Sequence, residues 1–291
     1  MFIIKHRFVF LTIAVLMVIA SWGSIFYYGL NLGIDFTGGA ILELEYPTGA
    51  RPTLENIHTE LTTLGRSDVL VQPIGDNGYL FRAKEISETD RTTLMGTSAV
   101  VKRFDSIGPT IGSELADKAL IAIALVLLLI IAYIALVFRK VSKPVASWKY
   151  GLAAIIALVH DISIPTGLFA YLGATQGTEI DALFLTALLA ILGLSVSDTI
   201  VVFDRVRENL QRRAANSFVD TVGLSLSQVM TRSINISLTT LIALTSVYFF
   251  GGESTRDFAL ALIVGMTAGT YSSVFIASPL LILFAGEGKK V

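Results

Sequence analysis

The amino-acid sequence predicts a membrane-embedded all-α bundle of six transmembrane helices, with one small α+β domain outside the membrane. Of its 291 residues, 53% are hydrophobic and 15% are charged, whereas about 25% of the residues in soluble domains are charged. Six apolar runs are each long enough to cross a bilayer as a helix. Between the first two runs, charged residues return and the apolar stretches shorten.

Residues 8–28 form the first apolar run, which follows the short basic start Lys5-His6-Arg7. The run ends in aromatic residues, as is typical of a membrane interface. It is longer than the apolar part of a cleavable signal peptide. We therefore expect residues 1–29 to form a cytoplasmic N-terminus and a retained first transmembrane helix.

Residues 30–115 read as a separate domain. Two glycines, Gly38 and Gly39, permit a tight entry into a strand. Alternation and spacing then predict a strand, a helix, two strands joined by the turn at residues 75–78, a second helix and a last strand, at residues 40–46, 53–64, 69–74, 79–83, 88–97 and 99–107. This βαββαβ order is that of a ferredoxin-like domain. Its mildly acidic surface argues against binding to nucleic acid, and no nucleophile–base pair of an enzyme stands out.

Five further spans are expected within residues 116–291, at residues 119–138, 151–172, 183–203, 233–250 and 258–284. The third span of the chain carries His160-Asp161 near its middle. Pro165 cannot donate a hydrogen bond to the carbonyl of Asp161, so a kink is expected there. His160 is either a neutral side chain bonded across helices or part of a proton relay.

The segment at about 204–232 is strongly charged and then shows apolar residues at three- and four-residue steps. We expect an amphipathic helix that lies on the cytoplasmic face of the membrane. Ser217 and Asp220 resemble a capping box at its start.

The distribution of basic residues predicts the orientation. The inner segments hold thirteen of the 22 Lys and Arg, whereas the short outer loops hold only Arg256. The thirteen are Lys5, Arg7, Arg139, Lys140, Lys143, Lys149, Arg205, Arg207, Arg212, Arg213, Arg232, Lys289 and Lys290. Because basic loops stay in the cytoplasm, both termini are expected there and residues 30–115 outside.

Asp198 lies inside the fourth span, where a carboxylate costs a few kcal/mol unless it faces protein or water. It either reaches the headgroup region or carries a proton or ion within the bundle. Arg232 begins the fifth span at a matching depth. If the two side chains pair, the carboxylate stays ionised until they separate in a dry site, which then favours proton uptake. A static ion pair that holds two helices together is the alternative.

Other metal and packing signals are weak. The chain has no cysteine and only three scattered histidines, so we expect no zinc or thiolate site and no cofactor. Gly265, Gly269 and Ser272 form a small-residue stripe on the sixth span. Small residues allow close helix contact, and we expect this stripe to contact a partner subunit.

Several segments together resemble the SecF branch of the SecD/SecF protein-export family. They are Gly33–Gly39, Gly108–Leu115, His160-Asp161, Gly193–Asn209, Arg232–Leu241 and Gly251–Pro279. The resemblance implies a six-helix half of a resistance–nodulation–division (RND) transporter in the bacterial plasma membrane. It implies an accessory subunit, not an enzyme, that uses the proton motive force to promote polypeptide export. The relay residues it implies are Asp198 and Arg232, to which we add His160 and Asp161.

The resemblance also implies partners: a SecD-like subunit, the SecYEG translocon, the exported unfolded polypeptide and membrane lipid. YajC-like and insertase subunits are further candidates. The family often has Tyr and Asn where this chain has Leu194 and Ser197, so fewer hydrogen-bonding groups are expected near Asp198. Two other functions stay open from the residues alone. They are an RND-type exporter of small molecules, for which the outer domain is small, and a purely structural subunit, for which Asp198 would be dispensable.

Overall fold

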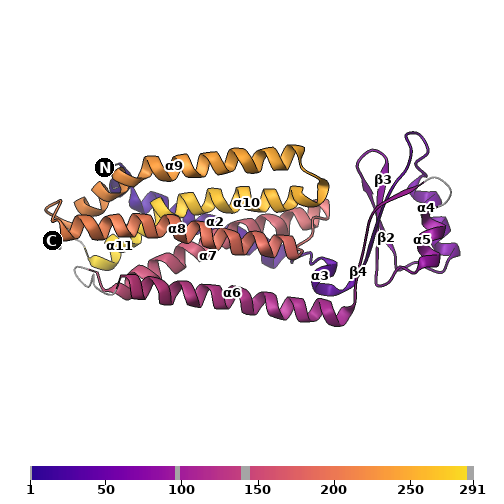
Figure 1. The fold of residues 1–291 in the computed structure, drawn as a ribbon, viewed down its shortest axis with the longest axis horizontal. Coiled ribbons are helices and arrows are strands. Elements are labelled where there is room, and N and C mark those ends of the chain that lie inside the picture. Colours follow the sequence, from indigo (N-terminus) through magenta and orange to yellow (C-terminus); the bar gives the residue numbers. More distant parts are fainter. Residues whose placement is uncertain (1, 96–98, 139–144, 287–291) are drawn as a thin grey trace. The chain divides into compact units, whose positions relative to one another are not determined.

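The structure is a computed structural model that describes residues 2–95, 99–138 and 145–286. It divides into two compact units, residues 1–31 with 121–291 and residues 32–120. Six helices in the described ranges are long and apolar enough to cross a membrane, which confirms the predicted number of spans. The helices at the two ends of the chain, α1 and α11, lie at the same end of the bundle (Figure 1). The bundle comprises α1 (Phe2–Lys5), α2 (Arg7–Tyr28), α6 (Pro109–Val137), α7 (Ser147–Gln176), α8 (Ala182–Gln211), α9 (Phe218–Phe250), α10 (Glu253–Ser272), the π-helical turn η1 (Ser273–Ala277) and α11 (Ser278–Ala285).

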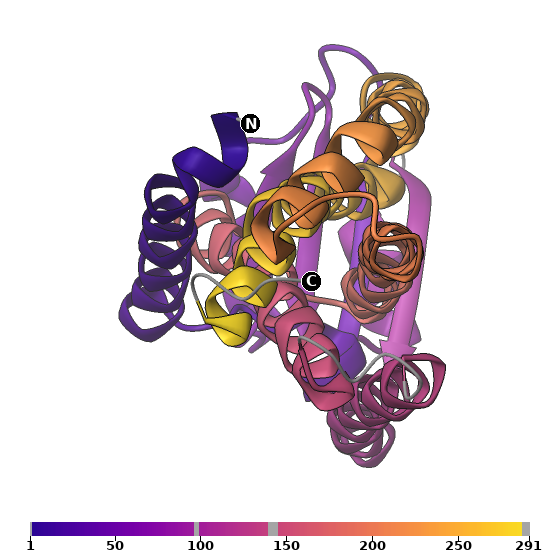
Figure 2. The same cartoon turned by 90° about the vertical axis from the view of Figure 1, so that its left-hand side faces the viewer.

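Two elements form the centre of the bundle. Over its most apolar 18 residues, α7 is 56% buried and the run from α10 to α11 is 61% buried, whereas the same stretches of α2, α6 and α9 are at most 11% buried. Seen end-on, α2, α6, α8 and α9 lie around the central pair (Figure 2). An aromatic cluster joins α6, α7 and α8, in which Phe138 stacks on Tyr150 at 5.2 Å and Phe203 meets Tyr150 edge-on at 5.3 Å. Side chains that are buried on α7 and α10 therefore face protein on most sides.

Capping residues set where the helices of the later half begin. The side chain of Asp181 accepts a hydrogen bond from the backbone N of Phe184 at 2.8 Å and starts α8. Ser217 accepts from the backbone N of Asp220 at 3.1 Å and donates to its carboxylate at 2.6 Å, which confirms the predicted cap. Each bond satisfies a free N–H at a helix start.

The expected separate amphipathic helix within residues 204–232 is wrong. Residues 204–211 continue α8, and α9 runs without interruption from Phe218 to Phe250. No proline and only one glycine, Gly223, fall within α9, so nothing breaks the helix before the membrane span. The apolar stripe was read at the correct spacing, but Phe218, Val222 and Leu226 pack into the core of the bundle. Similarly, the second span begins at Pro109, ten residues before the expected residue 119.

The basic residues of the loop before the third span lie partly outside the described residues. Arg139, Lys140 and Lys143 belong to residues 139–144, and Lys289 and Lys290 to residues 287–291. Lys149 is described and donates to the backbone carbonyl of Phe284 at 2.7 Å. The predicted membrane orientation stays a prediction.

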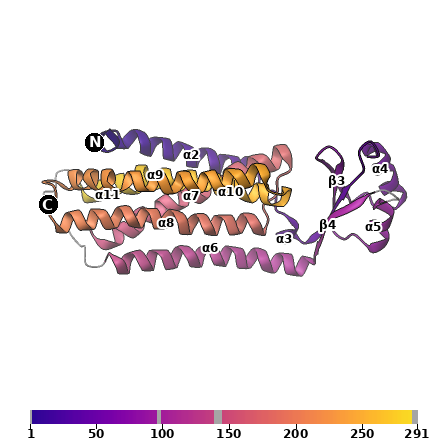
Figure 3. The same ribbon diagram turned by 45° about the horizontal axis from the view of Figure 1, so that its top comes forward.

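The small unit is a four-stranded antiparallel sheet with two helices on one face (Figure 3). Its element order is α3 (Ile34–Thr37), β1 (Gly39–Glu45), α4 (Leu54–Thr63), β2 (Leu70–Ile74), β3 (Gly78–Ala83), α5 (Glu88–Met95) and β4 (Val100–Ile107), and the strand order is β2-β3-β1-β4. The β1 residues Ala40, Leu42 and Leu44 are fully buried at alternate positions. They pack on Ile57 and Leu61 of α4. The predicted α and β segments are therefore present in the predicted order.

The two glycine-containing motifs of the small unit pack against each other. Gly38 has a φ of +71°, and a Cβ there would lie 2.5 Å from the Cα of Pro109. A Cβ on Gly112 would lie 2.5 Å from the backbone N of Gly38. Only glycine permits this approach and, at Gly38, this backbone conformation. The motif at residues 33–39 therefore fixes the start of α6 as well as the entry into β1.

The expected role of the small-residue stripe on the sixth span is also wrong. A Cβ on Gly269 would meet the side chain of Ser195 at 3.0 Å, and a Cβ on Gly265 would overlap Ile191. Both contacted residues belong to α8. The stripe therefore allows α10 and α8 to pack closely within this chain, and it is not a free surface for a partner.

Candidate functional site

Asp198 of α8 is half-buried and is held by hydroxyls from two neighbouring elements. Ser233 of α9 donates to its Oδ1 at 2.5 Å, and Ser273 of η1 donates to its Oδ2 at 2.5 Å. Asp198 thus lies between α8, α9 and the π-helical turn, as expected for a carboxylate that faces protein. Hydrogen bonds to the charged form reduce the cost of burying a carboxylate.

Asp161 of α7 is a second carboxylate and is completely buried, with 0% of its surface exposed. Its Oδ2 accepts hydrogen bonds from Ser195 of α8 at 2.5 Å and from Ser272 of α10 at 2.7 Å. Its Oδ1 lies 2.9 Å from Nδ1 of His160. Three elements of the bundle therefore converge on this one carboxyl group.

His160 is 2% exposed, and its ring stacks near Tyr271 with centroids 6.0 Å apart. Its Nε2 has no hydrogen-bond partner among the described residues. A protonated imidazole would leave a buried N–H unpaired at this position, which is costly. The arrangement therefore suits a neutral His160 whose Nδ1 shares a proton with Asp161. Pro165 follows inside α7, which continues to Gln176, and the predicted kink stays a prediction.

A cavity of about 130 Å³ opens beside Asp198 and is lined by residues of α8, α9 and α10, among them Ser197, Arg232, Ser237 and Thr270. A buried water needs only about 10–15 Å³ of such space, so the cavity has room for several waters. Ser237 and Thr270 share a hydrogen bond of 2.7 Å in its wall. The carboxylate is therefore beside a mainly apolar cavity that holds a few polar groups and has room for the waters through which a proton could reach it.

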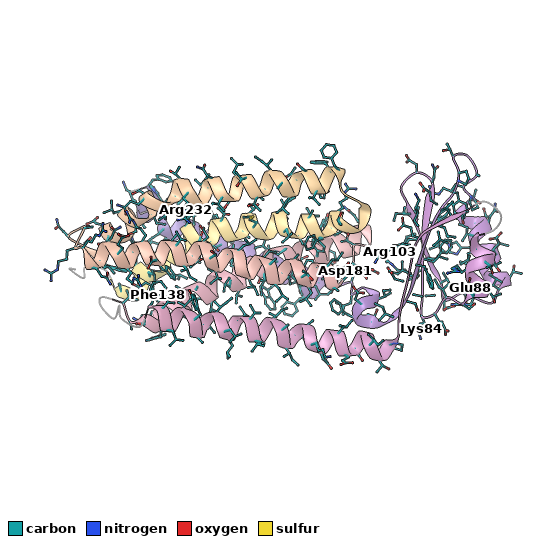
Figure 4. All side chains as sticks on the ribbon, viewed as in Figure 1. Lys84, Glu88, Arg103, Phe138, Asp181 and Arg232 are labelled. Atoms are coloured by element: carbon teal, nitrogen blue, oxygen red, sulfur yellow. The ribbon has the colours of Figure 1, made fainter. Side chains whose placement is uncertain are left out.

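The expected ion pair between Asp198 and Arg232 is not formed in this state. Among the residues that the structure describes, no salt bridge joins them, and the side chain of Arg232 is exposed. Arg232 does line the same cavity as Asp198, and it lies on α9 toward the end of the bundle where the chain begins (Figure 4). The sequence placed the two residues at a common depth, but serine hydroxyls occupy the bonding positions of the carboxylate.

Comparisons with known proteins agree with this geometry. Residues 87–287 match the family described as protein export membrane protein SecD/SecF, C-terminal, and residues 23–46 match the SecD/SecF GG motif. The protein translocase subunit SecF of Thermobaculum terrenum is 40% identical over 96% of this chain and 92% of its own length. SecF of Pseudomonas aeruginosa is 36% identical over 95% of this chain and 89% of its own length.

The chain belongs to the SecD/SecF family. The resemblance stated from the sequence is therefore confirmed.

Solved SecDF structures show the same fold. The crystal structure of SecDF from Thermus thermophilus, described as a translocon-associated membrane protein, is 31% identical with a TM-score of 0.83. A SecDF structure in a super-membrane-facing form is 32% identical with a TM-score of 0.64. This chain is covered to 97% and 94%, but it spans only 38% and 37% of those chains. It therefore corresponds to well under half of a SecDF chain.

Departures from the usual SecF residues can now be placed. Leu194 and Ser197 both line the cavity beside Asp198. The hydrogen bonds to the carboxylate come instead from Ser233 and Ser273 on other elements. The expectation of fewer hydrogen-bonding groups than the family usually has near Asp198 stays a prediction, and it considered neighbours along α8 only.

Sequence reasoning missed the serines that hold the two carboxyls. Ser272 was noted only as a small residue for helix packing, and Ser195 and Ser233 were not singled out. A usable signal exists: hydroxyl residues are unusually frequent near the acidic positions of these apolar helices, and polar side chains inside a membrane need partners. In the described parts of the chain, no three His, Asp or Glu side chains come together as metal ligands.

Proposed function

We propose that the chain is the SecF-type accessory subunit of a protein-export machinery, and that it uses the proton motive force to promote the movement of exported polypeptides. The proton-coupling role is supported by one observation: Asp198 is a carboxylate inside a predicted membrane span, it is held by two serines, and it lines a cavity with room for water. Carboxylates at such positions are costly and by default serve ion transport. The family membership supports the export role.

In this proposal Asp198 binds the proton and Arg232 responds to its charge. While Asp198 is held by two serines, Arg232 stays at the cavity wall. A movement of α9 relative to α8 would carry the guanidinium toward the carboxylate and release the proton, because a nearby cation favours the charged form. His160 and Asp161 form the inner part of the relay, in which Asp161 takes the proton and the neutral imidazole holds its carboxyl group in place through the contact between Nδ1 and Oδ1.

The remaining assignments follow from this role. We place both termini in the cytoplasm and the small unit on the outer side of the plasma membrane, with a ferredoxin-like fold supported by its strand order β2-β3-β1-β4. Ion sites in transporters of repeated halves lie at the interface of the halves. We therefore propose that a SecD-like half completes the transporter, and that the exposed apolar side of α6, with Leu125, Leu128 and Leu129, faces that half or lipid. SecYEG and the emerging polypeptide are the proposed further partners.

Export measured in membrane vesicles tests the proposal. Vesicles with the complete machinery are given a proton gradient, and Asp198→Asn is compared with Asp204→Asn. Asp204 is an exposed carboxylate six residues later that pairs with Arg207 at 2.7 Å, so it controls for the loss of a charge on α8. We expect gradient-stimulated export to vanish in Asp198→Asn and to persist in Asp204→Asn. Equal stimulation in both variants would refute the proposal.

The coupling ion needs a separate arm of that experiment. A carboxylate with hydroxyl oxygens from Ser233 and Ser273 also offers the oxygen ligands that hard cations prefer. A sodium gradient imposed at constant pH should have no effect on export if the ion is a proton. Stimulation by sodium alone would keep the role of Asp198 and replace the ion.

A further inference from the structure

Ser272 and Ser273 are consecutive residues, yet they donate hydrogen bonds to two different carboxyl groups. Ser272 donates to Asp161 of α7 at 2.7 Å, and Ser273 donates to Asp198 of α8 at 2.5 Å. Both serines are fully buried. One peptide unit therefore connects the two acidic groups of the bundle.

The backbone at this point is unusual. Ser272 ends α10, and Ser273 begins the π-helical turn η1. Pro279 follows at the start of α11 and has no N–H for the carbonyl four residues earlier, that of Phe275, so an α-helical bond is missing there. A π-helical turn inserts an extra residue into the helix, and such turns occur frequently at functional sites.

Each of the two serines also has a second acceptor. The Ser272 hydroxyl lies 3.1 Å from the carbonyl of Gly269, and the Ser273 hydroxyl lies 3.2 Å from the carbonyl of Thr270. A hydroxyl has one hydrogen and can donate it to only one of these acceptors at a time. A carboxylate is a stronger acceptor than a carbonyl, but a protonated carboxyl group is not. Protonation therefore favours turning the hydroxyl back to its own helix.

We propose that Ser272 and Ser273, here called the serine bridge, couple the proton affinities of Asp161 and Asp198 through the π-helical turn. The serines are positioning residues, and the proposal deepens the proposed function and rests on it. When one carboxyl takes a proton, its serine turns its hydroxyl to the carbonyl of α10. The peptide unit between Ser272 and Ser273 is then no longer held in place by a bond to that carboxyl. The adjacent serine then holds its own carboxylate less firmly, and the second proton binds more readily.

The sign of this coupling distinguishes it from direct electrostatics. Arg232 from α9 lines the same cavity as Asp198. The other acidic group, Asp161 of α7, is bonded to His160, which has Tyr271 of α10 next to it, and the serine bridge connects it to Asp198. Between two acidic groups, charge repulsion alone makes protonation of one disfavour protonation of the other. The serine bridge acts in the opposite direction.

Carbodiimide labelling of the full-length chain in lipid vesicles measures both sites separately, because the reagent modifies protonated carboxyl groups and mass spectrometry assigns each peptide. Ser272→Ala removes a bond to Asp161 only, yet we expect both carboxyls to label at a pH higher by about one unit, a tenfold gain in proton affinity. Ser273→Ala should likewise move both. A shift confined to the carboxyl that the serine touches, or a shift of the other carboxyl to lower pH, would overturn the proposal.

Two matched variants complete the test. Thr267→Ala removes an exposed hydroxyl of α10 that donates only to Ile263, and it should move neither profile. Ser195→Ala removes a bond to Asp161 and leaves both serines of the bridge in place. Asp161 should then take its proton at higher pH, and the intact bridge should move the Asp198 profile in the same direction, because coupling between two sites is reciprocal. In a Ser273→Ala background, where the bridge is broken, the added Ser195→Ala should move the Asp161 profile alone. If Ser195→Ala moves the Asp198 profile equally with and without Ser273, the coupling does not run through Ser272 and Ser273. Labelling does not depend on export, so a failure of the proposed function, in which Asp198→Asn exports normally, can be told apart from a failure of the serine bridge.

Discussion

Replacing Gly269 by alanine should destabilise the bundle from within this chain. The new methyl group would lie 3.0 Å from Cβ and 3.2 Å from Oγ of Ser195, and 3.6 Å from Oδ2 of Asp161. The first two distances are closer than van der Waals contact allows, so Ser195 must shift. Its 2.5 Å hydrogen bond to Asp161 would then lengthen or break. A substitution of one methyl group therefore perturbs both the packing of α8 on α10 and the partners of Asp161.

The expected magnitude is the sum of three effects. Overpacking costs about 1–3 kcal/mol, and loss of a hydrogen bond to a charged group costs about 1.5–3 kcal/mol. The higher helix propensity of alanine offsets roughly 1 kcal/mol of this loss. The net loss in the free energy of unfolding is then about 1.5–5 kcal/mol.

Thermal unfolding of the purified chain in detergent provides the assay, with Gly193→Ala as the matched control. Gly193 is an exposed residue in the middle of α8, and a Cβ there would meet nothing within 4 Å. We expect Gly269→Ala to lower the Tm by roughly 5–10 °C, and Gly193→Ala to leave it unchanged or raise it slightly. Equal melting temperatures for the two variants would refute the close packing of α10 on α8. The measurement needs no partner subunit, because the stripe packs within the chain.

Three further predictions concern single features. Arg232→Met should leave the Tm of the chain within about 1 °C of the parent, because the side chain is exposed and forms no ion pair with Asp198 within the described residues. The same variant should reduce gradient-stimulated export. A large loss of stability would instead indicate a static ion pair. Burial and the nearby Glu60 raise the pKa of Tyr46 to about 12, so its stabilising contribution is complete below pH 10 and is lost as the pH rises through about 12. Tyr46→Phe should therefore remove one tyrosine from the late phase of the absorbance titration, and an unchanged late phase would contradict this. Residues 32–120 expressed alone should give a mixed α/β circular dichroism spectrum and melt cooperatively, whereas a disordered fragment would show that this unit does not fold independently.

Much of the fold follows from the sequence because apolar length and periodicity are local properties. The six spans and the strand and helix segments of the small unit depend on runs of neighbouring residues. The continuity of α9 was missed because an apolar stripe has the same spacing whether it faces a membrane surface or a protein core. Phe218 and Val222 pack against other helices of the chain, and that choice depends on residues far away in the sequence.

The site could be predicted only in part for the same reason. Asp198 and Asp161 are identifiable because a carboxylate in an apolar run is costly wherever its helix packs. The partners of each carboxylate are not local, since Ser233 and Ser273 lie 35 and 75 residues from Asp198 along the chain. A shared depth in the membrane suggested Arg232 as the partner, but depth does not specify which side of a helix faces which neighbour. Ser233 and Ser273 donate to Asp198 because α9 and η1 place their hydroxyls next to this residue of α8.

Proton entry into vesicles tests the central claim, that Asp198 couples proton movement to export, most directly. The chain and its SecD-like partner are reconstituted in vesicles that contain a pH-sensitive dye, and a proton gradient is imposed across the membrane. The account predicts that the parent and Asp204→Asn admit protons at the same rate, and that Asp198→Asn, although folded and inserted, admits protons no faster than empty vesicles. Proton entry through Asp198→Asn at the parent rate would contradict it.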